Sequence, residues 1–435
     1  MESSYFNKST NPLHSWKNQL LLGTTTSALH FTIPTIPKRE EIRLVGEHLL
    51  FCSGAKKKHQ ITQYALATAE RKRVTLLFVG DICFSAATKY YVEHGYCSYN
   101  DSFKDVATYI READVSIGNL ESPFVGGNVY PHIYKGRKSV ILDASPSAAS
   151  ALSFAGFDAV SIANNHMNDF SSEGVDFTVE TLKKAGIQHF GNSYGEWSSS
   201  QEPLIMEVKG TKIGFLGYCD SPSVYKNCTE MRMLFKSGPA IYRDDIARRD
   251  VKSLREAEVD IIVVVIHFGA ELYSQPLPYQ RRISRHLISL GVQIIIGAHP
   301  HVLQPHCLHN STLVAYSLGN FLFYPRRPHG GSSLGVYGRL GKKPNKKIIE
   351  AFEHFVLGNC EDLKISQMLK VTVTRGRLLE AEYLPVKIKF DKEKKLLHPE
   401  PTRKAEWIKV CTKEDRQCQP DCKTKDDEMR HNTNK

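Results

Sequence analysis

Strand-length apolar runs recur through the middle of the chain, with helix-like segments between them. VTLLFVG at 74–80, VSIGN at 115–119 and DAVSIAN at 158–164 have the length of strands. FKDVATYIREAD at 103–114 and EGVDFTVETLKKAG at 173–186 repeat apolar residues at helical spacing. Strands that alternate with helices in this way predict an α/β fold with a partly parallel sheet.

The second half of the chain adds strands of two kinds. IIVVVIH at 261–267 and VQIIIGAH at 292–299 are continuous apolar runs, typical of strands covered on both faces. LIMEVKGTKIGFLGY at 204–218 has two runs parted by Gly-Thr and predicts a hairpin. LKVTVTRG at 369–376 and RLLEAEYLPVKI at 377–388 predict two further strands. Mixed parallel and antiparallel pairing is therefore expected.

Composition divides the chain into three parts. Residues 1–70 mix Ser, Thr, Pro and Lys with few apolar positions, which predicts a loosely ordered extension. Residues 71–390 carry the strands and helices and form the expected domain, with a Gly-, Lys- and Pro-rich mobile loop at 326–349. Residues 391–435 are charged and polar, and we expect a disordered tail there.

Bulk properties are those of a globular protein, with 435 residues, 41% hydrophobic and 24% charged. We find neither an apolar run of 18 residues nor a signal-like start, so we expect no membrane span and a cytoplasmic location. The ten cysteines are scattered too thinly for a disulfide scaffold, so reduced thiols are expected. Cys411, Cys418 and Cys422 lack a fourth partner at zinc spacing.

The net charge of +11 comes with short basic clusters, such as KKK at 56–58 and RKR at 71–73, which are typical of solvated surfaces. Aromatic residues are not interleaved with them, so nucleic acid is not an expected partner. The basic balance favours an anionic small molecule or polymer as the substrate.

Polar residues capable of binding metal stand where several apolar runs end. Each has an ordinary explanation when taken alone, such as a cap, a turn or a core histidine. Strand ends of one sheet meet along a single edge, so together they predict one site. These residues are Asp81, Glu121, Asn165, His166, His267, His299 and His301.

The stretch IIIGAHPHVLQP places two histidines around Pro300. Proline disfavours the helical region for the residue before it, so an extended segment is expected over 299–301. Side chains at i and i+2 of an extended chain point to the same side. His299 and His301 are therefore expected to face one point.

Carboxylate, amide and imidazole groups suit divalent ions such as Mn, Fe, Zn or Mg. Six candidate ligands exceed what one tetrahedral ion needs, which favours two ions that clamp the attacking and leaving oxygens. Such a centre suits phosphoryl transfer.

The motifs GDIC, ANNHMND, HFGAELY, GAHPHVLQP and YSLGNF together resemble the CapA (PgsA) family of capsule and poly-γ-glutamate synthesis proteins, whose domain looks like a calcineurin-type metallophosphoesterase. The resemblance covers residues 74–325 and extends to the strands before 388. It implies a four-layer α-β-β-α sandwich with mixed sheets. It also implies metal ligation by Asp81, Glu121, Asn165, His267, His299 and His301, proton donation to the leaving group by His166, and orientation of His166 by Asp169.

One departure concerns the first motif. The wider phosphoesterase superfamily opens with D-x-H, whereas Asp81 is followed here by Ile82 and Cys83. One histidine ligand is missing, as it generally is in the CapA family. A thiolate from Cys83 is the substitute that the sequence offers.

Several functions stay open on this reasoning. Water activated by the metals would attack phosphorus in a phosphoesterase, or carbonyl carbon in a γ-glutamyl amide hydrolase or transferase. A non-catalytic metal-containing binder of an anionic polymer and an inactive scaffold are the alternatives. Asn164, Glu271 and Asn320 stand beside the motifs and are expected to line the cleft.

Overall fold

The computed structural model describes residues 73–126, 141–220, 236–323, 361–402 and 406–419, together with Cys228 and without Ala86, Trp197 and Asn310. All of them belong to one compact unit, Ala65–Lys435. The extension expected over 1–70 and the loop expected over 326–349 lie outside the described residues.

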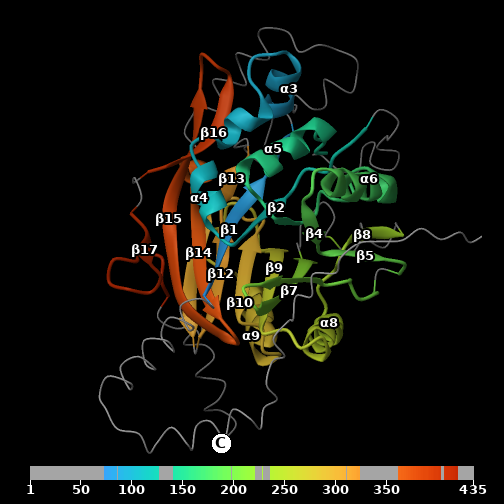
Figure 1. The fold of residues 1–435 in the computed structure, drawn as a ribbon, viewed down its shortest axis with the longest axis vertical. Coiled ribbons are helices and arrows are strands. Elements are labelled where there is room, and N and C mark those ends of the chain that lie inside the picture. The colour runs from blue at the N-terminus through green and yellow to red at the C-terminus, as the bar shows by residue number, and fades with distance from the viewer. Residues whose placement is uncertain are drawn as a thin grey trace, which may run out of the picture. The chain divides into compact units, whose positions relative to one another are not determined.

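Two mixed sheets form the middle of this unit (Figure 1). In spatial order, the larger sheet contains β16 (Leu396–Pro401), β15 (Arg377–Asp391), β14 (Ile365–Thr374), β1 (Val74–Ile82), β2 (Val115–Leu120), β3 (Ala159–Ser161) and β4 (Gln188–Phe190). Two short strands extend it: β13 (Asn320–Leu322) pairs with β1, and β17 (Ile408–Lys409) with β15. The smaller sheet contains β11 (Leu303–His309), β12 (Thr312–Leu318), β10 (Ile294–Ala298), β9 (Ile261–Phe268), β7 (Thr211–Asp220) and β6 (Leu204–Val208).

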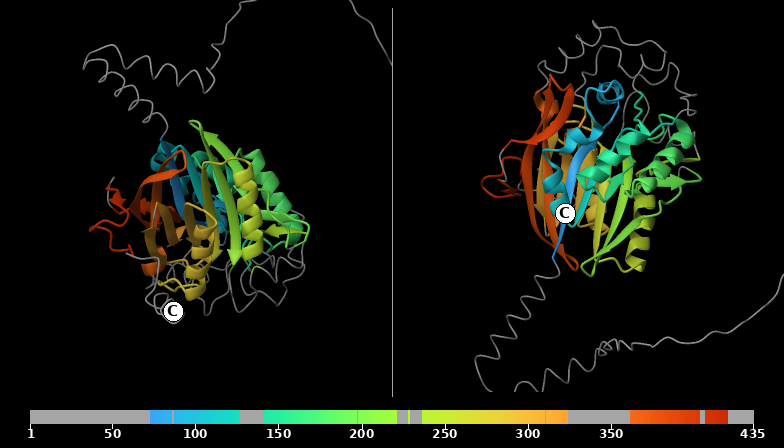
Figure 2. Two further views of the ribbon diagram at one scale, coloured as in Figure 1. Left: turned by 90° about the horizontal axis from the view of Figure 1, so that it is seen from below. Right: turned by 45° about the horizontal axis from the view of Figure 1, so that its top comes forward.

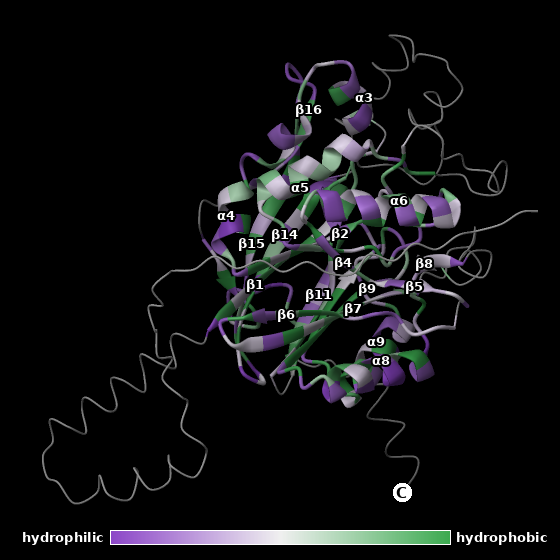
Figure 3. Cartoon of the chain, turned by 45° about the vertical axis from the view of Figure 1, so that its right-hand side comes forward, coloured by the Kyte–Doolittle hydropathy of each residue, from purple (hydrophilic) through white to green (hydrophobic). Residues whose placement is uncertain are grey.

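Helices cover the outer faces of both sheets. α3 (Ala87–Glu93), α4 (Ala107–Glu112), α5 (Ala149–Ala155) and α6 (Ser171–Lys184) contribute to the core on the larger sheet. α8 (Asp244–Glu256) and α9 (Pro278–Ser289) pack on the smaller sheet, as Figure 2 shows for α8. The exposed sides of α6 and α8 are largely hydrophilic, whereas the strands beneath are hydrophobic (Figure 3). Amphipathic helices over apolar strands bury their hydrophobic surface in this arrangement.

Three hydrophobic cores separate four layers. In β1, Leu77 and Val79 face the helices, whereas Leu76 and Phe78 face the smaller sheet. In β9, Val263 and Val265 face the larger sheet, and Val264 faces α8 and α9 on the other side. Alternate side chains of a strand point to opposite faces, so strands that are apolar throughout can fill two cores. The predicted four-layer sandwich with mixed sheets is confirmed.

The predicted hairpin is confirmed as β6 and β7, which pair antiparallel from Leu204–Phe215 to Val208–Thr211. Its turn is at Lys209 and Gly210, whose φ angles are 51° and 73°, rather than at Gly-Thr as expected. Positive φ at both central residues matches the twist of a two-residue hairpin.

The tail expected from residue 391 is wrong for its first part. β16 pairs antiparallel with β15 over Val386–Asp391, and β17 pairs with Tyr383 and Glu382. Leu396 and Leu397, at the start of β16, are buried, although charged residues surround them in sequence. The long edge of β15 supplies backbone partners that local composition does not reveal. The rest of the expected tail, from residue 420, lies outside the described residues.

The expectation of reduced thiols is also wrong for several cysteines. Disulfides join Cys219 to Cys228 and Cys411 to Cys418, with Cα separations of 5.8 and 4.9 Å. Cys307 is disulfide-bonded as well. Such pairs depend on the spatial approach of two Cα atoms, which the sequence spacing did not show. Among the helices that the structure describes, we find none that combines the length and apolarity of a membrane-spanning helix.

Candidate metal centre

The ends of parallel strands bring the predicted ligands together. β1 and β2 run parallel in the larger sheet, and β9 and β10 run parallel in the smaller one. Asp81 lies at the end of β1 and Glu121 directly after β2. His267 lies near the end of β9, and His299 follows β10. The two sheets therefore bring these polar strand ends to one place.

Glycines allow the close approach of these strand ends. A Cβ on Gly80, just before Asp81, would clash with the backbone carbonyl of Gly319, and a Cβ on Gly297 would clash with that of Tyr316. Both positions tolerate no side chain without backbone movement.

Glu121 is the centre of the cluster. Its carboxylate is fully buried. Oε1 lies 3.8 Å from His301 Nε2, 3.9 Å from His267 Nε2 and 4.0 Å from His166 Nε2. Three imidazoles from different loops and strands thus converge on one carboxylate oxygen.

Asp81 lies beside this group and is also fully buried. Its Oδ2 is 3.3 Å from His301 Nδ1 and accepts a hydrogen bond of 3.3 Å from the backbone N–H of His299. Ligand atoms of Asp81, Glu121 and His301 all lie within 4.8 Å of one another.

A second group of donors adjoins the first. His267 Nε2 lies 3.0 Å from Asn165 Oδ1 and 3.0 Å from His299 Nδ1. The rings of His267 and His299 are 4.6 Å apart between centroids. All six predicted ligands therefore belong to one buried cluster.

His166 has a different environment from the other histidines. Its Nδ1 lies 2.8 Å from Asp169 Oδ2, which also accepts a hydrogen bond of 2.7 Å from the backbone N–H of Leu142. A carboxylate at Nδ1 fixes the orientation of the ring and makes Nε2 the nitrogen that faces Glu121.

The two histidines around Pro300 respond differently to their surroundings. Burial lowers the pKa of His299 far below its usual value, and His301 and His166 add to this effect. Burial lowers the pKa of His301 too, but Glu121 and Asp81 outweigh it and raise the pKa to about 10. The field around the carboxylates therefore favours positive charge.

The extended backbone expected over 299–301 is wrong. The φ angles of His299 and His301 are 96° and 59°, which place both residues in the left-handed half of conformational space. The backbone turns there, and the two rings still reach the cluster with their centroids 6.1 Å apart. Positive φ is costly for residues with side chains and persists where surrounding contacts hold it.

The three residues expected to line the cleft have separate places. Asn164 is buried and donates to the Leu120 carbonyl at 2.8 Å, while its Oδ1 accepts from the His166 backbone at 3.2 Å. Asn320 Oδ1 lies 2.9 Å from His301 Nδ1. Glu271 is exposed, and its charge contributes to the raised pKa of His301. Asn164 and Asn320 support the cluster from within the core.

Asn119 also belongs to the cluster of candidate ligands, and sequence reasoning missed it. Its Nδ2 donates to Asp81 Oδ1 at 2.7 Å and lies 3.4 Å from His267 Nδ1. Asn119 pairs in register with Asp81 across β1 and β2. A polar residue at the buried end of VSIGN, two positions before Glu121, was the available signal.

Cys83, the substitute that the sequence offers for the missing histidine, is not part of the group formed by the ligand atoms of Asp81, Glu121 and His301. Its side chain is buried, and burial raises the pKa of the thiol well above its usual range, with a further contribution from Glu121. The cluster of Cys411, Asp415 and Cys418 is no metal site either, because its two sulfurs form a disulfide.

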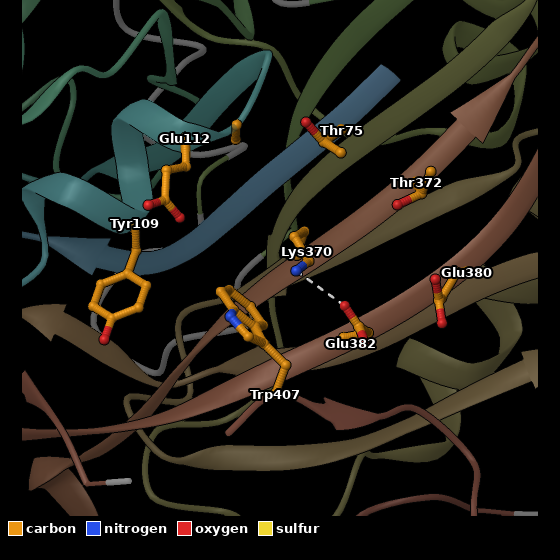
Figure 4. A pocket seen from close by; sticks show the side chains of 9 residues that line it. Thr75, Tyr109, Glu112, Lys370, Thr372, Glu380, Glu382 and Trp407 are labelled. Atoms are coloured by element: carbon orange, nitrogen blue, oxygen red, sulfur yellow. Dashed lines mark ion pairs between the residues drawn. The ribbon is translucent and has the colours of Figure 1, made fainter. Parts of the chain in front are cut away.

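A polar groove of about 280 Å³ lies elsewhere, between α4, the larger sheet and the C-terminal segment (Figure 4). Lys370 pairs with Glu382 at 3.0 Å and lies 4.1 Å from the Trp407 ring centroid. Lys409 pairs with Glu380 at 2.5 Å. No candidate ligand lines this groove, and two of its three carboxylates, Glu380 and Glu382, pair with lysines. We therefore assign the chemistry to the buried cluster.

Divalent metal ions fit the donor set of the cluster. Metal bonds to carboxylate oxygen and imidazole nitrogen are roughly 2.0–2.2 Å long, so two ligand atoms on one ion lie roughly 3–4 Å apart. The spacings of 3.8 and 3.9 Å between Glu121 Oε1 and the Nε2 atoms of the proposed ligands His301 and His267 agree with this range. Carboxylates, an amide and imidazoles also have the chemistry of a divalent-ion site.

Fold and site together define an α/β sandwich protein with a candidate metal centre at its strand ends. A model of the family described as "Bacterial capsule synthesis protein PGA_cap" matches residues 75–325, so the chain belongs to this family.

Relatives bear related names. The chain is 29% identical over 256 residues to "Capsule biosynthesis protein CapA" of Bacillus anthracis, and the aligned region covers 58% of this chain and 61% of that protein. It is 29% identical over 250 residues to "PGA biosynthesis protein CapA" of Bacillus subtilis (strain 168), with coverage of 57% and 62%. The chain thus spans about three fifths of the length of these relatives.

A solved structure is also similar. The calcineurin-like phosphoesterase YfkN from Bacillus subtilis has a TM-score of 0.39 and 14% identity, and the match covers 72% of this chain and 90% of that chain.

Proposed function

We propose that the chain is a metal-dependent hydrolase with a centre for two divalent ions. The convergence of His166, His267 and His301 on Glu121 Oε1 at 3.8–4.0 Å carries this proposal. Asp81, Glu121 and His301 form one set of donors, and Asn165, His267 and His299 form an adjoining set. Six donors in two adjoining sets exceed the needs of one ion.

When bound, divalent ions polarise the bond to be broken and make water a stronger nucleophile at neutral pH. The protein holds the donors in place through Asn119, Asn320 and the backbone N–H of His299. Burial of Asp81, Glu121 and His267 keeps competing water away from the charges and strengthens their interactions.

His166 is proposed as the proton donor to the leaving group. Asp169 accepts at Nδ1, so Nε2 is the atom that gives up the proton on the side of the cluster. Asp169 stabilises the charged ring and is itself anchored by the Leu142 backbone. In His267, the nitrogen remote from Glu121, Nδ1, lies 3.4 Å from the Asn119 amide. In His301, that nitrogen lies 3.3 Å from Asp81, which is itself a proposed metal ligand, whereas Asp169 is not.

The substrate class follows from the family and the charge. The names of the relatives concern capsule, PGA or polyglutamine synthesis. With a net charge of +11, we propose an anionic polymer or small molecule with a phosphoester or γ-glutamyl linkage as the substrate. The alternative is a protein that binds such a polymer without hydrolysing it, and the experiment below distinguishes the two.

Metal analysis of the purified protein, combined with hydrolysis assays, tests the proposal. The substrates are a phosphodiester, a phosphomonoester and a γ-glutamyl polymer, each with and without a chelator. We expect bound metal and an activity that the chelator abolishes and added divalent ions restore. Metal retention without any hydrolysis would favour the binder, and activity that is insensitive to chelator would overturn the mechanism.

The location is proposed separately. The disulfides Cys219–Cys228 and Cys411–Cys418 favour an oxidising compartment over the cytoplasm expected from the sequence, because cytosolic thiols are kept reduced. Titration of accessible thiols in the denatured protein from its native source checks this. Fully reduced cysteines in that material would return the location to the cytoplasm.

A further inference from the structure

A loop of exposed residues lies directly beside the candidate metal centre. Residues 271–275 follow β9 shortly after His267 and are all exposed. Two of them are large and apolar: Leu272 is 40% exposed and Tyr273 is 58% exposed. We call Glu271, Leu272 and Tyr273 the ledge.

The backbone of the ledge is fixed to the segment that carries the two histidines. The N–H of Leu272 donates to the carbonyl of Pro300 at 2.8 Å. Pro300 lies between His299 and His301, so the ledge is hydrogen-bonded to the ligand-bearing segment itself. Leu272 has a φ of 67°, a strained value for a residue with a branched side chain.

Buried glutamines hold the ledge from below. Gln304 Nε2 donates to the carbonyl of Tyr273 at 2.8 Å, and Gln304 Oε1 accepts from Gln280 Nε2 at 3.0 Å. Both glutamine side chains are almost fully buried. Gln280 Oε1 also accepts from the backbone of Leu277, at the start of α9. Polar groups in the core thus position a loop whose side chains point away from that core.

Exposure of this kind is unusual in the described part of the chain. Leu272 and Tyr273 are neighbours in sequence, whereas the other large hydrophobic residues exposed there are isolated. The isolated ones are Tyr96, Tyr194, Ile205, Leu308 and Leu379. Single exposed apolar residues are normal. A rigidly held pair beside a polar centre is a surface prepared for contact, because an aromatic ring contributes large area with little conformational entropy to lose.

We propose that the ledge determines specificity by packing against the carbon-rich, non-reacting part of the substrate. This inference rests on the proposed hydrolase function and extends it to the group attached to the reacting centre. Leu272 and Tyr273 cover an aryl or methylene surface, and the Glu271 carboxylate accepts a hydrogen bond from an N–H or O–H beside it. Inorganic phosphate, which has no carbon, gains nothing from the ledge.

Equilibrium binding to the metal-loaded protein tests the inference without turnover. Phenylphosphonate and inorganic phosphate are the probes, and calorimetry measures both dissociation constants. The unaltered protein should bind phenylphosphonate more tightly than phosphate, and Tyr273→Ala should reduce this preference by roughly 3–10-fold while phosphate affinity stays unchanged. Tyr273→Phe should retain the preference, since the ring remains.

Tyr194→Ala is the matched control. Tyr194 is 53% exposed and lies in the small two-stranded sheet of β5 (Asn192–Tyr194) and β8 (Ser237–Pro239), not at the strand ends of the centre. This variant should leave both affinities unchanged. For an aryl phosphoester, Tyr273→Ala should raise KM with little change in kcat.

The outcomes separate the inference from the function on which it rests. If the unaltered protein binds both probes through the metals and Tyr273→Ala keeps the full preference, the ledge has no part in specificity and the hydrolase proposal stands. If the metal-loaded protein binds neither probe and hydrolyses no ester, the proposed function fails, and the inference fails with it.

Discussion

Two buried histidine–aspartate pairs invite comparison. His166 Nδ1 lies 2.8 Å from Asp169, and His306 Nε2 lies 2.5 Å from Asp415. All four side chains are largely or fully buried. The second ring nitrogen of His166 lies 4.0 Å from Glu121, in the candidate metal centre. The second ring nitrogen of His306 has no hydrogen-bond partner among the described residues.

The contacts of His306 indicate a structural role. Asp415 accepts from the backbone of Cys411 at 2.7 Å and of Gln417 at 2.9 Å, inside the loop closed by the Cys411–Cys418 disulfide. The backbone of His306 exchanges hydrogen bonds with Gln417 and Gln419. The pair therefore attaches the C-terminal segment to β11.

The comparison teaches that the pair itself does not identify a catalytic histidine. Hydrogen bonding to a carboxylate orients either ring in the same way. What differs is the other nitrogen, which faces a cluster of metal-type ligands in one case and the protein interior in the other. Substitutions at the two sites should therefore affect different properties.

The largest effect is expected for the ligands. His299→Ala and His301→Ala should each sharply lower the metal content. Their loss of metal affinity should exceed the roughly 10–100-fold loss that follows removal of a residue that only hydrogen-bonds to a ligand. His306→Ala is the matched control and should keep the metal. Metal analysis after dialysis measures all three. If both ligand variants kept full metal stoichiometry, the proposed metal centre would be wrong, and these histidines would have only a hydrogen-bonding role.

The next effect concerns turnover. His166→Ala should keep nearly all of the metal while lowering turnover by roughly 10²–10⁴-fold on substrates with poor leaving groups, as expected for loss of a general acid. The deficit should shrink with p-nitrophenolate as the leaving group, because that anion hardly needs a proton. Steady-state assays with paired substrates measure this. An equal deficit on both substrates would rule out proton donation by His166.

A smaller effect is expected at the structural pair. His306→Ala removes a hydrogen bond to a buried carboxylate and should lower the free energy of unfolding by about 2–3 kcal/mol. Denaturant unfolding, monitored for both alanine variants, should show a smaller loss for His166→Ala. If the order were reversed, the assignment of His306 as the structural member would be wrong.

Sequence patterns predicted the α/β strands and the proposed ligands because both depend on strands and their ends, whereas the four layers were implied by the family resemblance. Runs such as IIVVVIH identify strands locally, and the ends of parallel strands meet whatever the loops do. Asn119 was missed because its contact with Asp81 depends on the register between β1 and β2. The backbone turn at His299, where φ is 96°, was missed because the partners of this segment, Asp81 and Leu272, are distant in sequence.

The C-terminal segment was mistaken for another reason. Its local composition is charged, but β15 offers an open edge and His306 a buried partner, neither of which lies nearby in sequence. The two described disulfides join cysteines only nine and seven residues apart, but they depend on how the loop between the two cysteines folds, which composition does not show. Local patterns thus predicted elements and strand ends, while pairings across the fold had to be observed.

The smallest effect that we expect is a pH dependence of the stability that Asp415, the partner of His306, contributes. Burial raises the pKa of Asp415, but His306 and the backbone donors of Cys411 and Gln417 outweigh it and hold the pKa below its ordinary value of 3.8. A carboxyl with a depressed pKa stabilises the fold fully above its unfolded pKa, and this stabilisation is lost as the pH falls through the lower, folded value. Asp415→Asn has no such charge to lose. The difference in unfolding free energy between the two proteins should therefore narrow as the pH falls below 3.8. Denaturant unfolding at a series of pH values measures it, and a difference that stays the same down to pH ~2 would show that the ionised Asp415 does not hold the C-terminal segment in place.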